Sequence, residues 1–92
     1  MKVDAAETLA LRGLAWLVTN DELLPVFLGA TGSDQDDLRN RAGDTDFLAS
    51  VLDFLTMDDA WVIAFCDAEN LPYTAPMQAR QALPGGAQVN WT

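Results

Sequence analysis

The side chains of this chain that are able to do chemistry are its carboxylates and a single thiol. The 92 residues contain 14 Asp and Glu, 5 Lys and Arg, one cysteine and no histidine. Histidine is the side chain that most often moves protons near neutral pH, and a zinc site of the usual kind needs several Cys or His ligands. The acids and Cys66 are therefore the remaining candidates for catalysis or metal binding.

The acids form three close pairs, which are Asp36/Asp37, Asp44/Asp46 and Asp58/Asp59. Oxygens grouped on one loop can replace the hydration shell of a hard cation, and paired carboxylates can act as acid and base. Each pair, however, stands at the predicted start of a helix, where capping and the helix dipole already account for it. An EF-hand spacing also fails, because Leu38 falls where a ligand is needed and Arg39 where glycine is needed. The sequence thus predicts no catalytic residue, no metal ligand and no cofactor.

Cys66 is predicted to be a structural thiol, because the charges nearest to it in its helix are acids, which disfavour the thiolate. A lone cysteine cannot form an internal disulfide, which is typical of a reducing compartment. Asp4, Glu7 and Arg12 interrupt the apolar run that a signal peptide needs. No stretch approaches the ~20 apolar residues of a membrane span. We therefore expect a cytoplasmic protein with no membrane partner.

The net charge of −9 at pH 7 bears on which partners the chain can bind. Nucleic acid phosphates and anionic membranes are repelled by such a charge, and 5 scattered cations do not form a basic patch. The simpler inference is a basic protein partner, while solubility alone also explains the acidity.

Apolar residues recur at the three-to-four spacing of amphipathic helices in most of the chain. The first predicted helix covers residues 3–18, and a short second helix around 24–28 is stopped by Gly29 to Gly32. A mostly polar third helix runs from a cap at Ser33 to near Gly43, and a fourth runs from a cap at Asp44 or Thr45 to Leu55. The fifth helix covers residues 60–69 after a cap at Thr56, and the last covers residues 73–83. No segment has the period of a strand, and Ala87 to Thr92 is predicted to be a loose tail that contains Trp91. Five aromatic residues are assigned to the core: Phe27, Phe47, Phe54, Trp61 and Phe65.

Two helices are apolar on more than one side. The first helix carries Leu9 and Trp16 on one flank of its core face and Leu11 and Val18 on the other, which predicts two neighbours for it. In the fifth helix a wheel of 100° per residue groups Trp61, Ala64, Phe65 and Ala68, and it leaves another face beside several acids. That second face is made of Val62, Ile63 and Cys66. The candidate partner-binding residues are therefore Leu9, Trp16, Val62, Ile63 and Cys66.

Two stretches of the sequence resemble a known family. They are DLRNRAGDTDFLASVLDFL over residues 37–55 and ARQALPG over residues 79–85. Together they resemble the bacterial domain-of-unknown-function family numbered 3572, and the resemblance runs from about Glu7 to Gly85. It implies a stand-alone all-helical domain of alphaproteobacterial type, with no assigned activity, cofactor or catalytic residue. Trp91 lies outside this pattern.

The sequence therefore predicts an all-α protein, a compact single domain of five to six short helices over residues 1–84 with a flexible C-terminal tail over 85–92. The fourth and fifth helices are expected to form its central hairpin. The predicted function is a non-enzymatic protein-interaction or regulatory module with an acidic surface. Two alternatives stay open, a structural homo-oligomer and a small enzyme or ligand-binding protein that uses the clustered Asp residues.

Overall fold

The computed structural model describes residues 1–84, so the predicted tail over 85–92, with Trp91, lies outside the described residues. Six helices make up the described part, and it contains no strand. They are α1 (Val3–Val18), α2 (Leu24–Thr31), α3 (Gln35–Asn40), α4 (Thr45–Leu55), α5 (Asp59–Glu69) and α6 (Ala75–Ala82). The predicted all-α class is confirmed.

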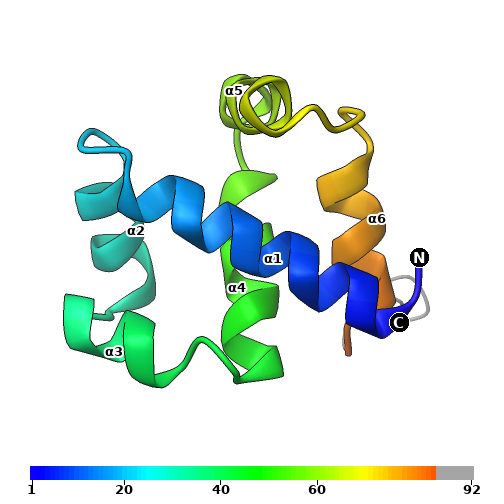
Figure 1. Ribbon diagram of the computed structural model, residues 1–92. Helices are drawn as coiled ribbons and strands as arrows, with labels where there is room; N and C mark the ends of the chain where they lie inside the picture. The colour runs from blue at the N-terminus through cyan, green and yellow to red at the C-terminus, as the bar shows by residue number, and fades with distance from the viewer. Residues whose placement is uncertain (85–92) are drawn as a thin grey trace, which may run out of the picture.

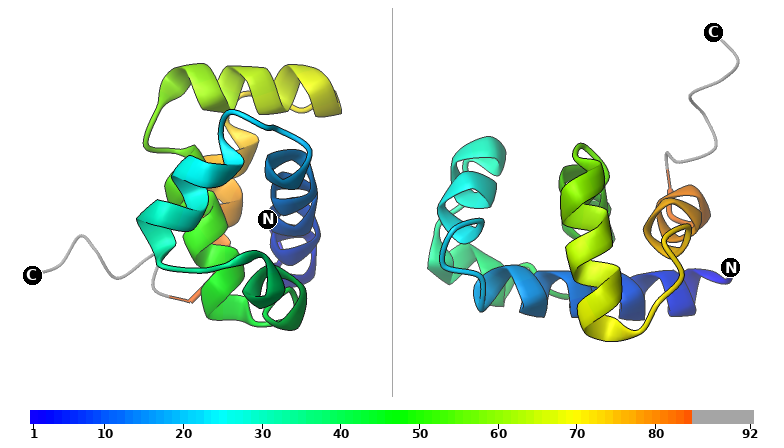
Figure 2. Two further views of the ribbon diagram at one scale, coloured as in Figure 1. Left: turned by 90° about the vertical axis from the view of Figure 1, so that its left-hand side faces the viewer. Right: turned by 90° about the horizontal axis from the view of Figure 1, so that it is seen from above.

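The long helix α1 runs across one side of the molecule, and α2, α4 and α6 lie side by side behind it (Figure 1). The closest packing joins α1, α4 and α6. Helix α3 follows α2 at one end of α1, and α5 crosses over the end of α4 where that helix stops (Figures 1 and 2). The expected central hairpin of α4 and α5 is therefore wrong, because α4 packs mainly on α1 and α6.

Small residues on α1 explain why α4 packs on it so closely. Ala6, Ala10 and Gly13 are buried on the side of α1 that faces the core. A Cβ atom placed on Gly13 would lie 3.0 Å from Leu55 Cδ1 and 3.6 Å from Val51 Cγ1, both on α4. The missing side chain at this position lets the two helices approach, so the face of α4 that a hairpin would offer to α5 is already covered by α1.

An aromatic cluster connects α2 and α5 to α4. Phe27 of α2 packs edge-to-face on Phe47 and Phe54, with ring centroids 6.1 and 5.2 Å apart, and Trp61 of α5 stacks on Phe54 at 4.6 Å. Such pairs add about 0.5–1.5 kcal/mol each beyond the area that they bury. Four of the five predicted core aromatics are buried, and Trp61 is half-buried.

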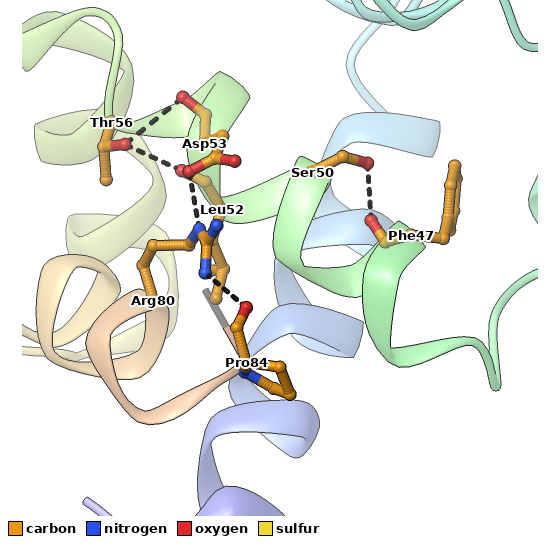
Figure 3. A network of polar contacts seen from close by, with 7 residues as sticks. All are labelled: Phe47, Ser50, Leu52, Asp53, Thr56, Arg80 and Pro84. Atoms are coloured by element: carbon orange, nitrogen blue, oxygen red, sulfur yellow. Dashed lines mark hydrogen bonds and ion pairs between the residues drawn. The ribbon is translucent and has the colours of Figure 1, made fainter. Parts of the chain in front are cut away.

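Polar contacts hold α6 against α4 (Figure 3). The Arg80 guanidinium donates through Nε to Asp53 Oδ1 at 2.6 Å and through Nη1 to the carbonyl of Pro84 at 3.2 Å. At the end of α4, the backbone N–H of Thr56 donates to the carbonyl of Leu52 at 3.0 Å, and Thr56 Oγ1 donates to the same carbonyl at 2.9 Å. Thr56 thus closes α4 and does not begin α5.

Candidate functional site

The acid pairs lie where capping predicts them. Asp34 caps α3 in a reciprocal box with Asp37, in which the backbone N–H of Asp37 donates to Asp34 Oδ1 at 2.9 Å. Asp44 accepts from the N–H of Asp46 at 2.9 Å, and Asp58 accepts from the N–H of Ala60 at 2.8 Å. The predicted caps at Ser33 and Thr56 are wrong by one and two residues, because an Asp stands closer to each helix start.

The acids do not assemble into an ion site in the described part of the chain. Among residues 1–84, no three Asp, Glu or Cys side chains lie close enough together to hold a metal ion. The carboxylates of the three N-cap residues, Asp34, Asp44 and Asp58, accept hydrogen bonds from backbone N–H groups in the first turns of their helices. What these acids do in this structure is begin helices.

Helix α5 presents a different face to the core from the one predicted. Phe65 and Cys66 are buried, Trp61 and Val62 are half-buried, and Ala64 and Ala68 are exposed. The reason is that α5 rests on two neighbours, with Trp61 on α4 and Phe65 on α1, so its buried sector is centred between the two predicted faces. The face predicted from Val62, Ile63 and Cys66 is split by this packing, and only Ile63, at 44%, is exposed.

The flank of Leu9 and Trp16 is a packing surface for α5. Leu9 is buried, and the half-buried Trp16 ring packs edge-to-face on Phe65 with centroids 5.8 Å apart. Next to them Arg12 donates from Nε to Glu69 Oε1 and from Nη2 to the Glu69 carbonyl, both at 2.9 Å. This flank is therefore occupied by the chain itself.

A small hollow of about 400 Å³ lies between the end of α5 and the following loop, and it contains Cys66, Asp67 and Tyr73. Burial raises the pKa of the Cys66 thiol, the Asp67 carboxylate raises it further, and the thiol donates to the Pro72 carbonyl at 3.4 Å. The Tyr73 hydroxyl donates to Asp67 Oδ1 at 2.7 Å, and this hydrogen bond raises the pKa of the phenol. Both groups are thus held in their neutral forms, which are poor nucleophiles.

A larger groove opens on the other flank of α1, between α1, α2 and α3. It has a volume of about 640 Å³. Its apolar lining residues are Leu11, Leu14, Ala15, Val18, Leu24 and Leu38, and its polar ones are Thr19, Gln35 and Arg39. Leu11 and Val18 are 42% and 45% exposed, although both are large apolar side chains of the longest helix.

The groove exists because α2 and α3 are too short to cover this flank. Helix α3 has 6 residues and buries only Leu38, and α2 has 8 residues and buries only Phe27. The two neighbours that the sequence predicted for α1 are therefore present, but only the one on the Trp16 side covers its flank. We define the groove between α1, α2 and α3, with the nine residues above, as the α1–α3 groove.

Arg39 is the charged residue that lines the α1–α3 groove. Three of the other cations are engaged: Arg12 with Glu69, Arg80 with Asp53, and Arg41 with Asp44 at 3.9 Å. Within residues 1–84, neither Arg39 nor Lys2 has an ion-pair partner. The sequence analysis missed Arg39 as a site residue, and the available signal was its position one residue after the inward-facing Leu38.

Comparison with known proteins gives one match. No curated protein and no solved structure matches the chain. A family model described as "Protein of unknown function (DUF3572)" matches residues 3–86, which include every helix of the structure. The resemblance found in the sequence is thereby confirmed, and the chain belongs to the DUF3572 family.

Proposed function

We propose that this protein is a small non-enzymatic interaction module that binds another protein in the α1–α3 groove. The observation that carries the proposal is the open apolar groove itself, in which Leu11 and Val18 remain exposed to water. Large apolar side chains gathered in a concave surface are typical of binding sites. A cytoplasmic location accompanies this proposal, since Cys66 is a free thiol.

The chemistry of the groove favours binding over catalysis. Its polar side chains are Thr19, Gln35 and Arg39, and none of them exchanges a proton readily near neutral pH. No helix within residues 1–84 is long and apolar enough to cross a membrane. The net charge of −9 also repels nucleic acids and anionic lipid surfaces.

Two substitutions of the same kind test the proposal. Val18 lies in the groove and is 45% exposed, whereas Val26 of α2 lies outside it and is 48% exposed. Val18→Asp and Val26→Asp change the net charge equally and leave the core intact. Affinity capture from native cytoplasm, with quantitative mass spectrometry, compares both variants with the unchanged protein.

We expect the unchanged protein and Val26→Asp to retain the same partner and Val18→Asp to lose it. Equal capture by both variants would contradict a binding role for the groove. A chain that sediments as a dimer, and as a monomer only after Val18→Asp, would identify the structural homo-oligomer instead.

A further inference from the structure

The residues around the α1–α3 groove indicate which kind of partner it binds, and this inference rests on the proposed function. We propose that the groove binds one amphipathic helix of a basic partner protein, with three apolar side chains on the groove floor and a hydrogen-bond acceptor opposite Arg39. Three properties of the groove support this choice: the backbone around it, its length and its charge.

The backbone around the groove favours a helical occupant. The groove is bordered by α1, α2 and α3, whose interior N–H and C=O groups are bonded within their own helices. An extended peptide placed there would find no sheet edge, so its own backbone groups would be covered without partners. A helix satisfies its backbone internally and offers the groove only side chains.

The length of the apolar floor matches two turns of helix. Leu11 and Val18 both line the groove, and at 1.5 Å per residue their separation along α1 is about 10 Å. A partner helix that lies along α1 presents side chains i, i+3 or i+4, and i+7 over the same distance. Three apolar anchors therefore cover the floor between Leu11 and Val18.

The positive charge of Arg39, on one side of the groove, requires a hydrogen-bond acceptor on the partner helix. Arg39 has no ion-pair partner among residues 1–84, and an occupant that covered its guanidinium without offering an acceptor would lose the hydration energy of that charge. A carboxylate on the flank of the partner helix that faces α3 supplies the strongest such acceptor.

The rest of the partner is basic. Asp21 and Glu22 are exposed in the turn between Thr19 and Leu24, two residues that line the groove, and Asp36 is exposed on α3. A second copy of this chain would bring a further charge of −9 to the same surface. The long-range field therefore opposes self-association and attracts a partner rich in Lys and Arg.

Designed peptides test this proposal directly. Two fluorescein-labelled helical peptides of about 18 residues both carry Leu at i, i+4 and i+7 and Lys on the outer face. They differ at one position beside the Leu residues, which is Glu in the first peptide and Gln in the second. Fluorescence anisotropy measures their Kd for the protein. We expect Val18→Asp to raise the Kd of both peptides about tenfold or more, and Val26→Asp to change this Kd by less than about twofold.

The role of Arg39 has its own matched control. Arg39→Gln and Lys2→Gln each remove one of the two cations that lack an ion-pair partner within residues 1–84. We expect Arg39→Gln to raise the Kd of the Glu peptide about two- to fivefold, as loss of an exposed ion pair does. The Kd of the Gln peptide should rise less, because its neutral amide oxygen accepts a weaker hydrogen bond than a carboxylate. Lys2→Gln should affect the two peptides equally. An equal loss for both peptides in Arg39→Gln would overturn the assigned acceptor.

The outcomes separate this inference from the proposed function. If neither peptide binds the unchanged protein while partner capture still depends on Val18, the helical occupant is wrong and the proposed function stands. If both peptides bind but Val18→Asp and Val26→Asp weaken them equally, their binding is general electrostatic attraction and the helical occupant is wrong. If capture does not depend on Val18 either, both proposals are wrong.

Discussion

At the scale of single residues, the acids of this chain are used mainly to begin and join helices. Asp34, Asp44 and Asp58 each accept a hydrogen bond from a backbone N–H in the first turn of the following helix. Caps of this kind stabilise a protein by about 0.5–2 kcal/mol each. The sequence predicted that acids stand at helix starts, because capping depends on residues that are neighbours along the chain. It placed two of the three caps at the wrong residue, at Ser33 and Thr56 in place of Asp34 and Asp58.

The hydrogen bond between Tyr73 and Asp67 gives a spectroscopic prediction. Tyr73 is the one tyrosine in the chain, and the hydrogen bond and charge of Asp67 raise the pKa of its phenol above the usual value. In Asp67→Asn the negative charge is gone, so the phenol should ionise at a lower pH than in the unchanged protein. Absorbance at 295 nm during a pH titration measures this directly. Identical titration curves for the two proteins would show that the contact does not form in solution.

Adjacent residues of α4 should respond very differently to truncation. Leu52 is fully buried, so Leu52→Ala empties a core position and should lower the free energy of unfolding by about 2–5 kcal/mol. Asp53 is exposed and pairs with Arg80, so Asp53→Ala should cost at most about 1 kcal/mol. Urea melts of both variants check the contrast, and equal losses would mean that the core face of α4 is wrongly assigned.

At the scale of helices, the sequence predicted where each helix lies to within a few residues, although Gly29, which was predicted to stop α2, lies inside that helix. It did not predict how the helices pack. Helix α1 matches its predicted range of 3–18. The close packing of α4 on α1 depends on Gly13 meeting Leu55, a contact between residues far apart in the chain that the pattern of apolar residues does not contain. The inward face of α5 was misjudged for a similar reason, since it is set by two neighbours, Phe54 and Trp16, that lie on different helices.

The close approach at Gly13 is tested by a pair of glycine substitutions. Gly13 and Gly29 are both helical, but a Cβ on Gly13 meets Leu55 at 3.0 Å, whereas a Cβ on Gly29 meets nothing within 4 Å. Gly13→Leu should therefore overpack the contact of α1 with α4 and lower the free energy of unfolding by about 1–3 kcal/mol. Gly29→Leu should raise it by up to about 1 kcal/mol, because leucine favours the helix. Thermal melts compare the two variants, and a stable Gly13→Leu protein would contradict the packing described for α1.

At the scale of the whole molecule, the binding surface follows from unequal cover on the two flanks of α1. One flank is covered by α5, which contributes Phe65 and Glu69, and the other faces two short helices that leave Leu11 and Val18 exposed. The sequence indicated that α1 has two apolar flanks. It did not indicate which flank stays open, because that depends on how far α2, α3 and α5 reach in three dimensions. The pattern of apolar residues therefore favours Leu9 and Trp16 as partner-binding residues, although α5 covers their flank.

The most direct test of the α1–α3 groove is site-specific photo-crosslinking in living cells, with benzoylphenylalanine placed at Val18 in one variant and at Val26 in the other. The two positions are almost equally exposed, so their access to passing proteins is the same. We predict that position 18 gives a discrete adduct with a second, basic protein and that position 26 does not. Adducts of the same mass from both positions, or an adduct from position 26 alone, would contradict the groove as the binding surface.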